Sequence, residues 1–261
     1  MRRGERAELL KILMMALVMM ALPLRTMAQI GEHRNELAIG FNAGYTLSNV
    51  GFTPSIQEGM LGNVTAGLSF RYTCEKYFTT VCAIVAELNL SKIGWKEDIL
   101  DSDDQPVINS VTGVAEEFER ELTYVQLPLM ARLGWGRERK GVQGFFQVGP
   151  QIGYYISDKK TANFDFDDRN TTDRVGAMQE AVNDTLEIQN KLDYGIVGGA
   201  GIEFSHPKIG HFILEGRYYY GLGDIFKNSK SDYFGRSNNN IITIKLTWLF
   251  DIVRSKNDKI R

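Results

Sequence analysis

Eight segments of the chain alternate apolar side chains with polar or small ones, and this alternation constrains the fold more than any other feature. It runs over residues 37–45, 64–72, 82–90, 125–135, 146–156, 194–204, 212–220 and 242–250. Successive side chains of a strand point to opposite faces, so each segment is predicted to be a strand with one apolar face. In the fourth segment that face carries Val125, Leu127, Leu129, Ala131, Leu133 and Trp135.

The connections between these segments alternate strictly between short and long. The short ones are 73–77, 136–140 and 205–210, and the long ones are 46–60, 93–118, 157–190 and about 223–238. Bacterial outer-membrane barrels have short periplasmic turns, long outer loops and an even number of strands. The sequence therefore predicts an all-β fold: an eight-stranded antiparallel up-and-down transmembrane β-barrel with short periplasmic turns and long extracellular loops.

The first 28 residues are predicted to be a secretory signal peptide. Basic residues precede an apolar run from Ile12 to about Leu24, which is shorter than the roughly 20 residues that a transmembrane helix needs. Small residues ending at Ala28 suit a signal peptidase, so we expect cleavage there instead of an uncleaved anchor. Residues 29–250 then form the barrel, residues 251–261 form a polar periplasmic tail, and the protein is placed in the outer membrane.

The charge balance excludes one class of partner. Without residues 1–28 the chain keeps 25 basic and 30 acidic side chains, a formal charge near −5. This balance implies no nucleic-acid partner. No motif implies a cofactor.

The other face of each strand places charges inside the barrel. Parity assigns four cations and four carboxylates to the lumen: Arg71, Arg132, Arg217 and Lys245 with Glu87, Asp193, Glu203 and Glu215. An eight-stranded barrel is only wide enough for side chains to fill it. We therefore expect these charges to pair with one another. Pro128 lies on the same face, and because it lacks a ladder donor we expect a bulge or a lumen-directed kink there.

Three stretches carry a resemblance to a known family. Residues 124–129 (YVQLPL), 193–204 (DYGIVGGAGIEF) and 214–225 (LEGRYYYGLGDI), with an alternating final strand, resemble the PorT family of outer-membrane β-barrel proteins, also described as porin-family proteins. Gln126 stands where that family commonly has a carboxylate. The resemblance covers the mature chain and implies an outer-membrane location and a role linked to protein secretion.

An enzymatic role is not expected. Small outer-membrane barrels that modify lipid A need a base near the outer leaflet. The three histidines lie elsewhere, with His33 before the first strand and His206 and His211 beside a short periplasmic turn.

Acidic residues gather in two long loops without forming a calcium motif. They are Asp98, Asp101, Asp103 and Asp104 in one loop, and Asp165, Asp167 and Asp168 in the other. The spacing, the turn glycine and the final bidentate Glu of a calcium loop are missing, which favours a solvated acidic loop. Loop 93–118 has a net charge of −6 and should repel anionic lipopolysaccharide unless divalent ions bridge them.

Cys74 and Cys82 flank the first short turn and share the lipid-side parity. An oxidising periplasm permits a disulfide between them. Directly paired strand cysteines often strain the bridge, so two reduced thiols are the equal alternative.

Two functions remain open from the sequence. One is a non-enzymatic barrel with a charge-plugged lumen that contacts outer-membrane lipid and lipopolysaccharide and binds a protein of a secretion or surface complex. The other is a narrow, porin-like channel for small solutes.

Overall fold

The computed structural model describes residues 32–55, 58–101, 103, 105–109, 112–164, 186–228 and 234–254. The predicted signal peptide, residues 1–28, lies outside this set. Among the described residues, no helix is long and apolar enough to cross a membrane.

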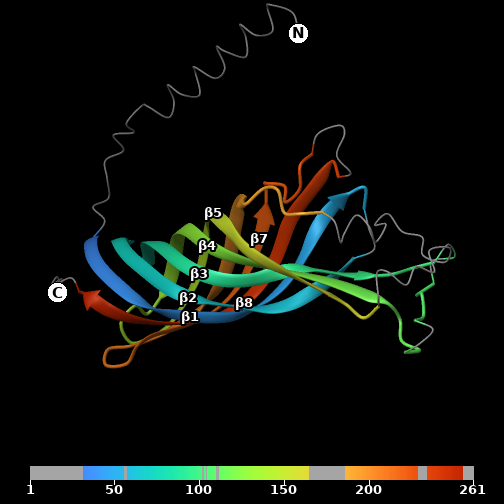
Figure 1. Cartoon of the computed structure of the whole chain (residues 1–261). Coiled ribbons are helices and arrows are strands. Elements are labelled where there is room, and N and C mark those ends of the chain that lie inside the picture. Colours follow the sequence, from blue (N-terminus) through green and yellow to red (C-terminus); the bar gives the residue numbers. More distant parts are fainter. Residues whose placement is uncertain are drawn as a thin grey trace, which may run out of the picture. The chain divides into compact units, whose positions relative to one another are not determined.

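Eight strands form one closed antiparallel barrel in which each pairs with its neighbour in sequence and the last returns to the first (Figure 1). This arrangement confirms the predicted fold class. The strands are β1 (Glu32–Thr53), β2 (Glu58–Tyr77), β3 (Thr80–Asp98), β4 (Glu117–Gly136), β5 (Gly141–Ala162), β6 (Leu192–His206), β7 (Gly210–Gly221) and β8 (Arg236–Val253).

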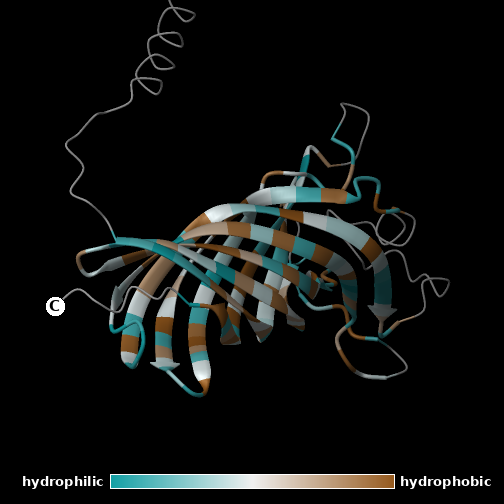
Figure 2. Cartoon of the chain, turned by 90° about the vertical axis from the view of Figure 1, so that its left-hand side faces the viewer, coloured by the Kyte–Doolittle hydropathy of each residue, from teal (hydrophilic) through white to brown (hydrophobic). Residues whose placement is uncertain are grey.

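The apolar face of every strand points outward, as the alternation predicts. Where β1 pairs with β8, Phe41 lies opposite Trp248 and both are exposed, whereas Asn42 lies opposite Thr247 and both are buried. Hydrophobic and hydrophilic bands therefore alternate along the strands (Figure 2). An oily exterior and a polar interior are what a barrel in lipid requires.

Two rows of exposed aromatic side chains mark the limits of the lipid-facing band. On β6 the rows are represented by Tyr194 and Phe204, ten positions apart. At about 3.4 Å per residue and a tilt near 45° this separation corresponds to about 24 Å of membrane, which agrees with the usual apolar band of about 25 Å. The row at the short-turn end contains Tyr72, Trp135, Phe146, Phe204, Phe212, Trp248 and Phe250, and the other row contains Tyr45, Tyr154, Tyr194, Tyr218 and Tyr220.

The strands run well beyond this band, so several predicted connections are wrong in their bounds. The predicted loop 46–60 is mostly strand, because β1 continues to Thr53, which pairs with Arg236 of β8. The predicted turn 73–77 belongs to β2, and the turn lies at residues 78–79. Outside the lipid a strand no longer needs an apolar outer face, so the apolar-outward pattern ends while the strand pairing continues. At the other end β8 extends to Val253, three residues into the predicted tail.

The expected bulge at Pro128 is also wrong. The β3–β4 register is the same on both sides of it, at Gln126 and at Leu129, and Pro128 itself pairs with Gln151 of β5. Proline removes one ladder hydrogen bond without inserting a residue, so the register survives. Its ring is buried on the lumen side.

We predict that charge on the outer face is costly only at lipid depth. Leu246 and Ile252 lie on β8 and are 64% and 63% exposed, but Leu246 faces the band and Ile252 lies beyond the aromatic row. Leu246→Arg should lower the free energy of unfolding by about 2–4 kcal/mol, and Ile252→Arg by about 0–1 kcal/mol. Denaturant titration of the protein in lipid vesicles measures both. Equal losses would contradict the assigned depth.

Candidate functional site

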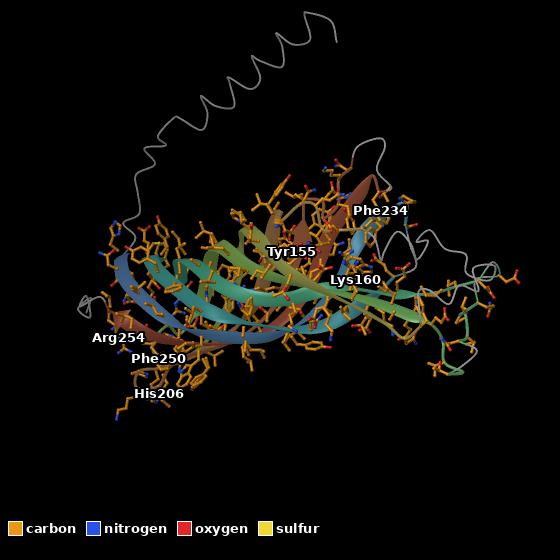
Figure 3. All side chains as sticks on the ribbon, viewed as in Figure 1. Tyr155, Lys160, His206, Phe234, Phe250 and Arg254 are labelled. Carbon is orange, nitrogen blue, oxygen red and sulfur yellow. The ribbon has the colours of Figure 1, made fainter. Side chains whose placement is uncertain are left out.

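The lumen contains two ion-pair clusters and an apolar plug, arranged along the barrel axis. The lower cluster lies toward the short-turn end, the middle cluster follows it, and the plug lies at the long-loop end. All eight predicted lumen residues point inward and are at most 8% exposed. The barrel ends are marked by His206 and Arg254 at the short-turn end and by Phe234 and Lys160 at the other (Figure 3).

The lower cluster is centred on Glu203 of β6. Arg71 of β2 donates to both carboxylate oxygens at 2.8 and 2.7 Å, and Arg132 of β4 donates to one of them. His211 Nδ1 of β7 lies 2.7 Å from Glu203 Oε1. One carboxylate thus collects donors from three other strands, which is how a buried charge is stabilised.

The middle cluster pairs two carboxylates with two cations. Arg217 of β7 donates to Glu87 of β3 through two nitrogens at 2.8 and 2.7 Å, a two-pronged geometry that is strong and directional. Lys245 of β8 also donates to Glu87. Arg217 lies 2.6 Å from Glu215, which accepts a further hydrogen bond from Gln147 at 2.7 Å.

Asp193 differs from the other seven predicted lumen residues. Tyr219 donates to it at 2.9 Å, and none of the ion pairs among the described residues includes it. It therefore does not join the predicted charge network. Asp193 lies near the start of β6, above the middle cluster, and its described neighbours there are hydroxyl and amide groups.

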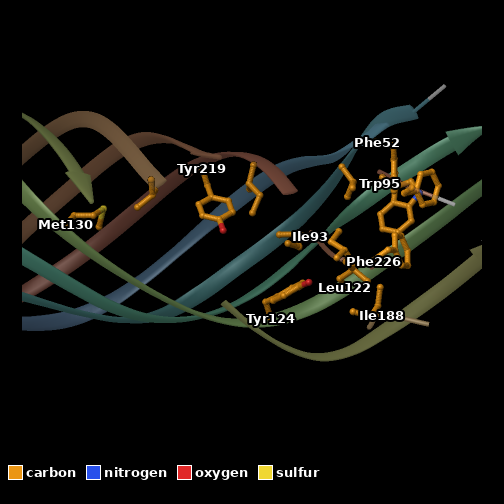
Figure 4. Packing of buried hydrophobic residues seen from close by; sticks show 14 of the residues in the cluster. Phe52, Ile93, Trp95, Leu122, Tyr124, Met130, Ile188, Tyr219 and Phe226 are labelled. Atoms are coloured by element: carbon orange, nitrogen blue, oxygen red, sulfur yellow. The ribbon is translucent and has the colours of Figure 1, made fainter. Parts of the chain in front are cut away.

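Above the clusters the interior turns apolar. Phe52, Ile93, Trp95, Leu122 and Tyr124 point inward from β1, β3 and β4, and all are at most 7% exposed (Figure 4). These residues lie on the strand extensions beyond the lipid-facing band, where water surrounds the barrel. The pattern inverts there, so apolar residues are inside. Phe52, Ile93 and Trp95 fall in stretches that were predicted to be loops, so this inversion was not predicted.

Two loop segments complete this plug. Ile188, just before β6, and Phe226, after β7, pack into the cluster. Asn190 joins the two segments, because its side-chain amide donates to the carbonyls of Asp224 and Phe226 at 2.8 and 3.1 Å. Described parts of two long loops therefore pack against the inward-facing apolar residues at this end of the barrel.

Arg120 ties one of these segments to the barrel wall. It is 1% exposed, lies 2.7 Å from Asp158, and donates to the Leu186 carbonyl at 2.8 Å. Its guanidinium also stacks over Trp95 at 5.8 Å. A register shift between β4 and β5 at Thr123 turns Asp158 inward to meet it.

The cavities bordered by described residues do not form one continuous passage through the lumen. A cavity of about 20 Å³ lies between the middle cluster and the plug, bordered by Gln126, Arg217 and Tyr219. That volume holds about one water molecule. A larger cavity of about 250 Å³ lies below, at the short-turn end, and its lining includes Arg71, Arg132 and Glu203.

The family described as outer membrane protein beta-barrel domain matches residues 27–227. The chain belongs to this family. The protein is therefore an outer-membrane β-barrel.

Three solved outer-membrane proteins are similar to it. Ail of Yersinia pestis is 13% identical with a TM-score of 0.36, covering 82% of this chain and 99% of its own. Neisserial surface protein A is 8% identical with a TM-score of 0.38, covering 82% and 97%. OprG of Pseudomonas aeruginosa is 9% identical with a TM-score of 0.37, covering 84% and 98%. No curated protein matches the chain.

The short-turn end of this family member contains a serine, a histidine and an aspartate in line. Ser205 Oγ lies 2.9 Å from His211 Nδ1, and His211 Nε2 lies 3.0 Å from Asp251. Hydrolases use such a triad with an accessible serine. Here Ser205 is fully buried and donates to Glu203, and the same histidine nitrogen lies 2.7 Å from Glu203. The arrangement supports orientation of Glu203, a role that the predicted turn position of His211 did not indicate.

Cys74 and Cys82 are both free thiols. The β2–β3 register shifts between Thr73 and Glu75, so Glu75 pairs with Cys82 in place of Cys74. This irregularity takes the two sulfurs out of direct opposition. Of the two open alternatives, the disulfide is the one that the structure does not adopt.

In the acidic loop 93–118, an aspartate side chain is bound by backbone amides of the same loop. Asp101 accepts hydrogen bonds from the amides of Asp103 and Gln105 at 2.8 and 2.9 Å. Among the described residues, no group of three His, Cys, Asp or Glu side chains is arranged to hold a metal. Asp104, Asp165, Asp167 and Asp168 lie outside the described residues.

The two clusters predict which pairs are energetically coupled. Arg217→Met should lower the free energy of unfolding by about 3–5 kcal/mol, because it strands buried carboxylates. Adding Glu215→Gln should recover at least about 1 kcal/mol, since Glu215 is in contact with Arg217. Glu203→Gln is the matched control, because Glu203 lies in the lower cluster. Combined with Arg217→Met, it should lower the free energy of unfolding further and recover none of the loss. Denaturant unfolding of the three combinations checks this, and equal coupling to both glutamates would contradict the separation into two clusters.

Proposed function

We propose that the protein is a sealed, non-enzymatic outer-membrane barrel that acts as a structural or partner-binding component. The observation that carries this proposal is the double closure of the lumen. The middle ion-pair cluster crosses the lumen at lipid depth from β3 to β7 and β8, and the apolar plug around Trp95 and Phe226 packs inside the barrel at the long-loop end. A solute could cross the barrel only if both the ion-pair cluster and the apolar plug were displaced.

The resemblance to the PorT family extends the proposal. In the stretch 124–129, Tyr124, Gln126 and Pro128 point into the lumen while Val125 and Leu127 face lipid. One face of this stretch therefore belongs to the barrel interior and the other faces lipid, so neither face is a docking surface exposed to water. We propose a PorT-type protein whose partner is a component of a secretion or surface complex, with contacts made by the ends of the barrel.

The β3–β4 connection supports a partner-binding role for the long-loop end. We call this connection, residues 99–116, the arm. Two isolated antiparallel β-bridges, Leu100 with Pro106 and Ile108 with Ala115, lie within it. Ile108 and Val114 are each 57% exposed on it. Apolar side chains exposed on an acidic, hydrogen-bonded arm suit a protein with an apolar patch and basic edges. The outward belt supports contact with membrane lipid, and the acidic arm supports contact with lipopolysaccharide only through divalent ions.

We predict that the wild-type protein passes no steady current in planar lipid bilayers, because two seals lie in series. Trp95→Ala should remove packing from the apolar plug. We still expect no current through the bilayer, because the ion-pair cluster below the plug is intact. A porin of known conductance serves as the positive control. Steady wild-type conductance would replace the sealed barrel with the narrow-channel alternative.

We predict that the arm contacts a protein in cells. A photo-crosslinking amino acid at position 108 should give a protein adduct of defined mass in intact cells. The matched control is position 244, where Ile244 is 60% exposed but faces lipid, so it should give no such adduct. Adducts at both positions, or at neither, would count against the arm as the binding element.

A further inference from the structure

A polar cavity of about 250 Å³ opens at the short-turn end, opposite the proposed partner-binding arm. Its floor is the lower ion-pair cluster, where Arg71, Arg132 and Glu203 are buried. Its rim carries Arg139 and Arg254, whose side chains are 44% and 53% exposed. A molecule from the solvent on this side can therefore reach a charged floor past two guanidinium groups.

Two buried donors in the cavity wall lack an acceptor. They are Arg71 Nε and Gln143 Nε2, on residues that are 7% and 5% exposed. Both residues line the cavity. Buried donors are nearly always paired, so an unpaired donor on a residue that lines a cavity indicates a ligand or solvent acceptor there.

The position of the Gln143 carboxamide is set by the absence of a side chain on the neighbouring strand. A Cβ at Gly134 would lie 2.8–3.0 Å from the atoms of that carboxamide. Gly134 thus leaves the space that the Gln143 head group occupies. The backbone pairing of Gln143 with Glu203 places it directly beside the lower cluster.

The carboxylates around the cavity already have cationic partners. Glu203 is bound by Arg71 and Arg132, and Asp251 lies 2.9 Å from Arg254. The described ion pairs of this end involve six Arg or Lys side chains and five carboxylates, namely Arg34, Arg71, Lys76, Arg132, Arg139 and Arg254 with Glu32, Glu36, Glu138, Glu203 and Asp251. His211 lies between two of these carboxylates and adds a further donor. The local balance favours an anion.

We propose that this cavity binds one small oxyanion, a phosphate or carboxylate group, through Gln143 Nε2 and Arg71 Nε. The volume is smaller than that of a typical drug-sized pocket and suits a single anionic group with a short stem. The rim arginines attract the anion, and the two unpaired donors fix it. This site is independent of the lumen seals and of the extracellular arm.

Isothermal titration calorimetry of the detergent-solubilised mature chain tests the proposal with inorganic phosphate at constant chloride. We expect saturable binding at one site. Gln143→Met keeps the side-chain length and removes the donor, so it should weaken binding at least tenfold. Gln151→Met is the matched control: it also points inward from β5, but it borders the small upper cavity instead. It should bind as the wild type does.

Two further arms identify the source of the anion. A short peptide with a free C-terminal carboxylate is compared with the same peptide amidated. Binding of the free acid alone assigns the site to a peptide carboxylate, and binding of phosphate alone assigns it to a phosphate group. Arg254→Gln, at the exposed rim, should weaken either ligand severalfold without changing heat-modified gel mobility, which covers the case that Gln143→Met misfolds. Absence of saturable binding of both probes, or unchanged affinity in Gln143→Met, overturns the proposal and leaves a solvated cavity.

Discussion

The structure depends on the absence of water from the membrane interior. Each strand must pair its backbone groups on both sides within hydrocarbon, because an unpaired N–H or C=O there costs several kcal/mol. Pairing of β1 with β8 meets that condition by removing the sheet edges. With eight strands the enclosed space is only as wide as side chains, so whatever the inward face carries must fit and pair. The ion-pair clusters are a consequence of closure.

The face of each strand that carries apolar side chains changes along the length of the strand. At lipid depth Leu246 faces out and Lys245 faces in. On the extensions beyond it Lys92 faces out and Trp95 faces in. The change in solvent alone accounts for this inversion, because the apolar face follows the less polar surroundings. The upper part of the barrel is thus built as a small water-soluble barrel continuous with the membrane-embedded one.

The alternation was enough to predict the number of strands, their direction and the face of each lumen charge. It was not enough to predict the position of each charge along the barrel axis or its ion-pair partner. Parity specifies only which face of the strand a residue is on. Glu203 and Glu215 share a face, yet only Glu215 meets Arg217. The shift at Cys74 and the Ser205–His211–Asp251 contact arise from register and barrel closure, which no local pattern encodes. The strand extensions were missed because their polarity matches that of an ordinary loop.

The pairing pattern across the lumen constrains how the barrel is assembled. Glu203 of β6 takes its guanidinium partners from β2 and β4, and Glu87 of β3 takes its partners from β7 and β8. Each cluster therefore joins the first half of the chain to the second. Either half alone in the bilayer would carry charges without counter-charges, which hydrocarbon strongly disfavours. Insertion of both halves together, with closure in the same cooperative event, avoids that cost.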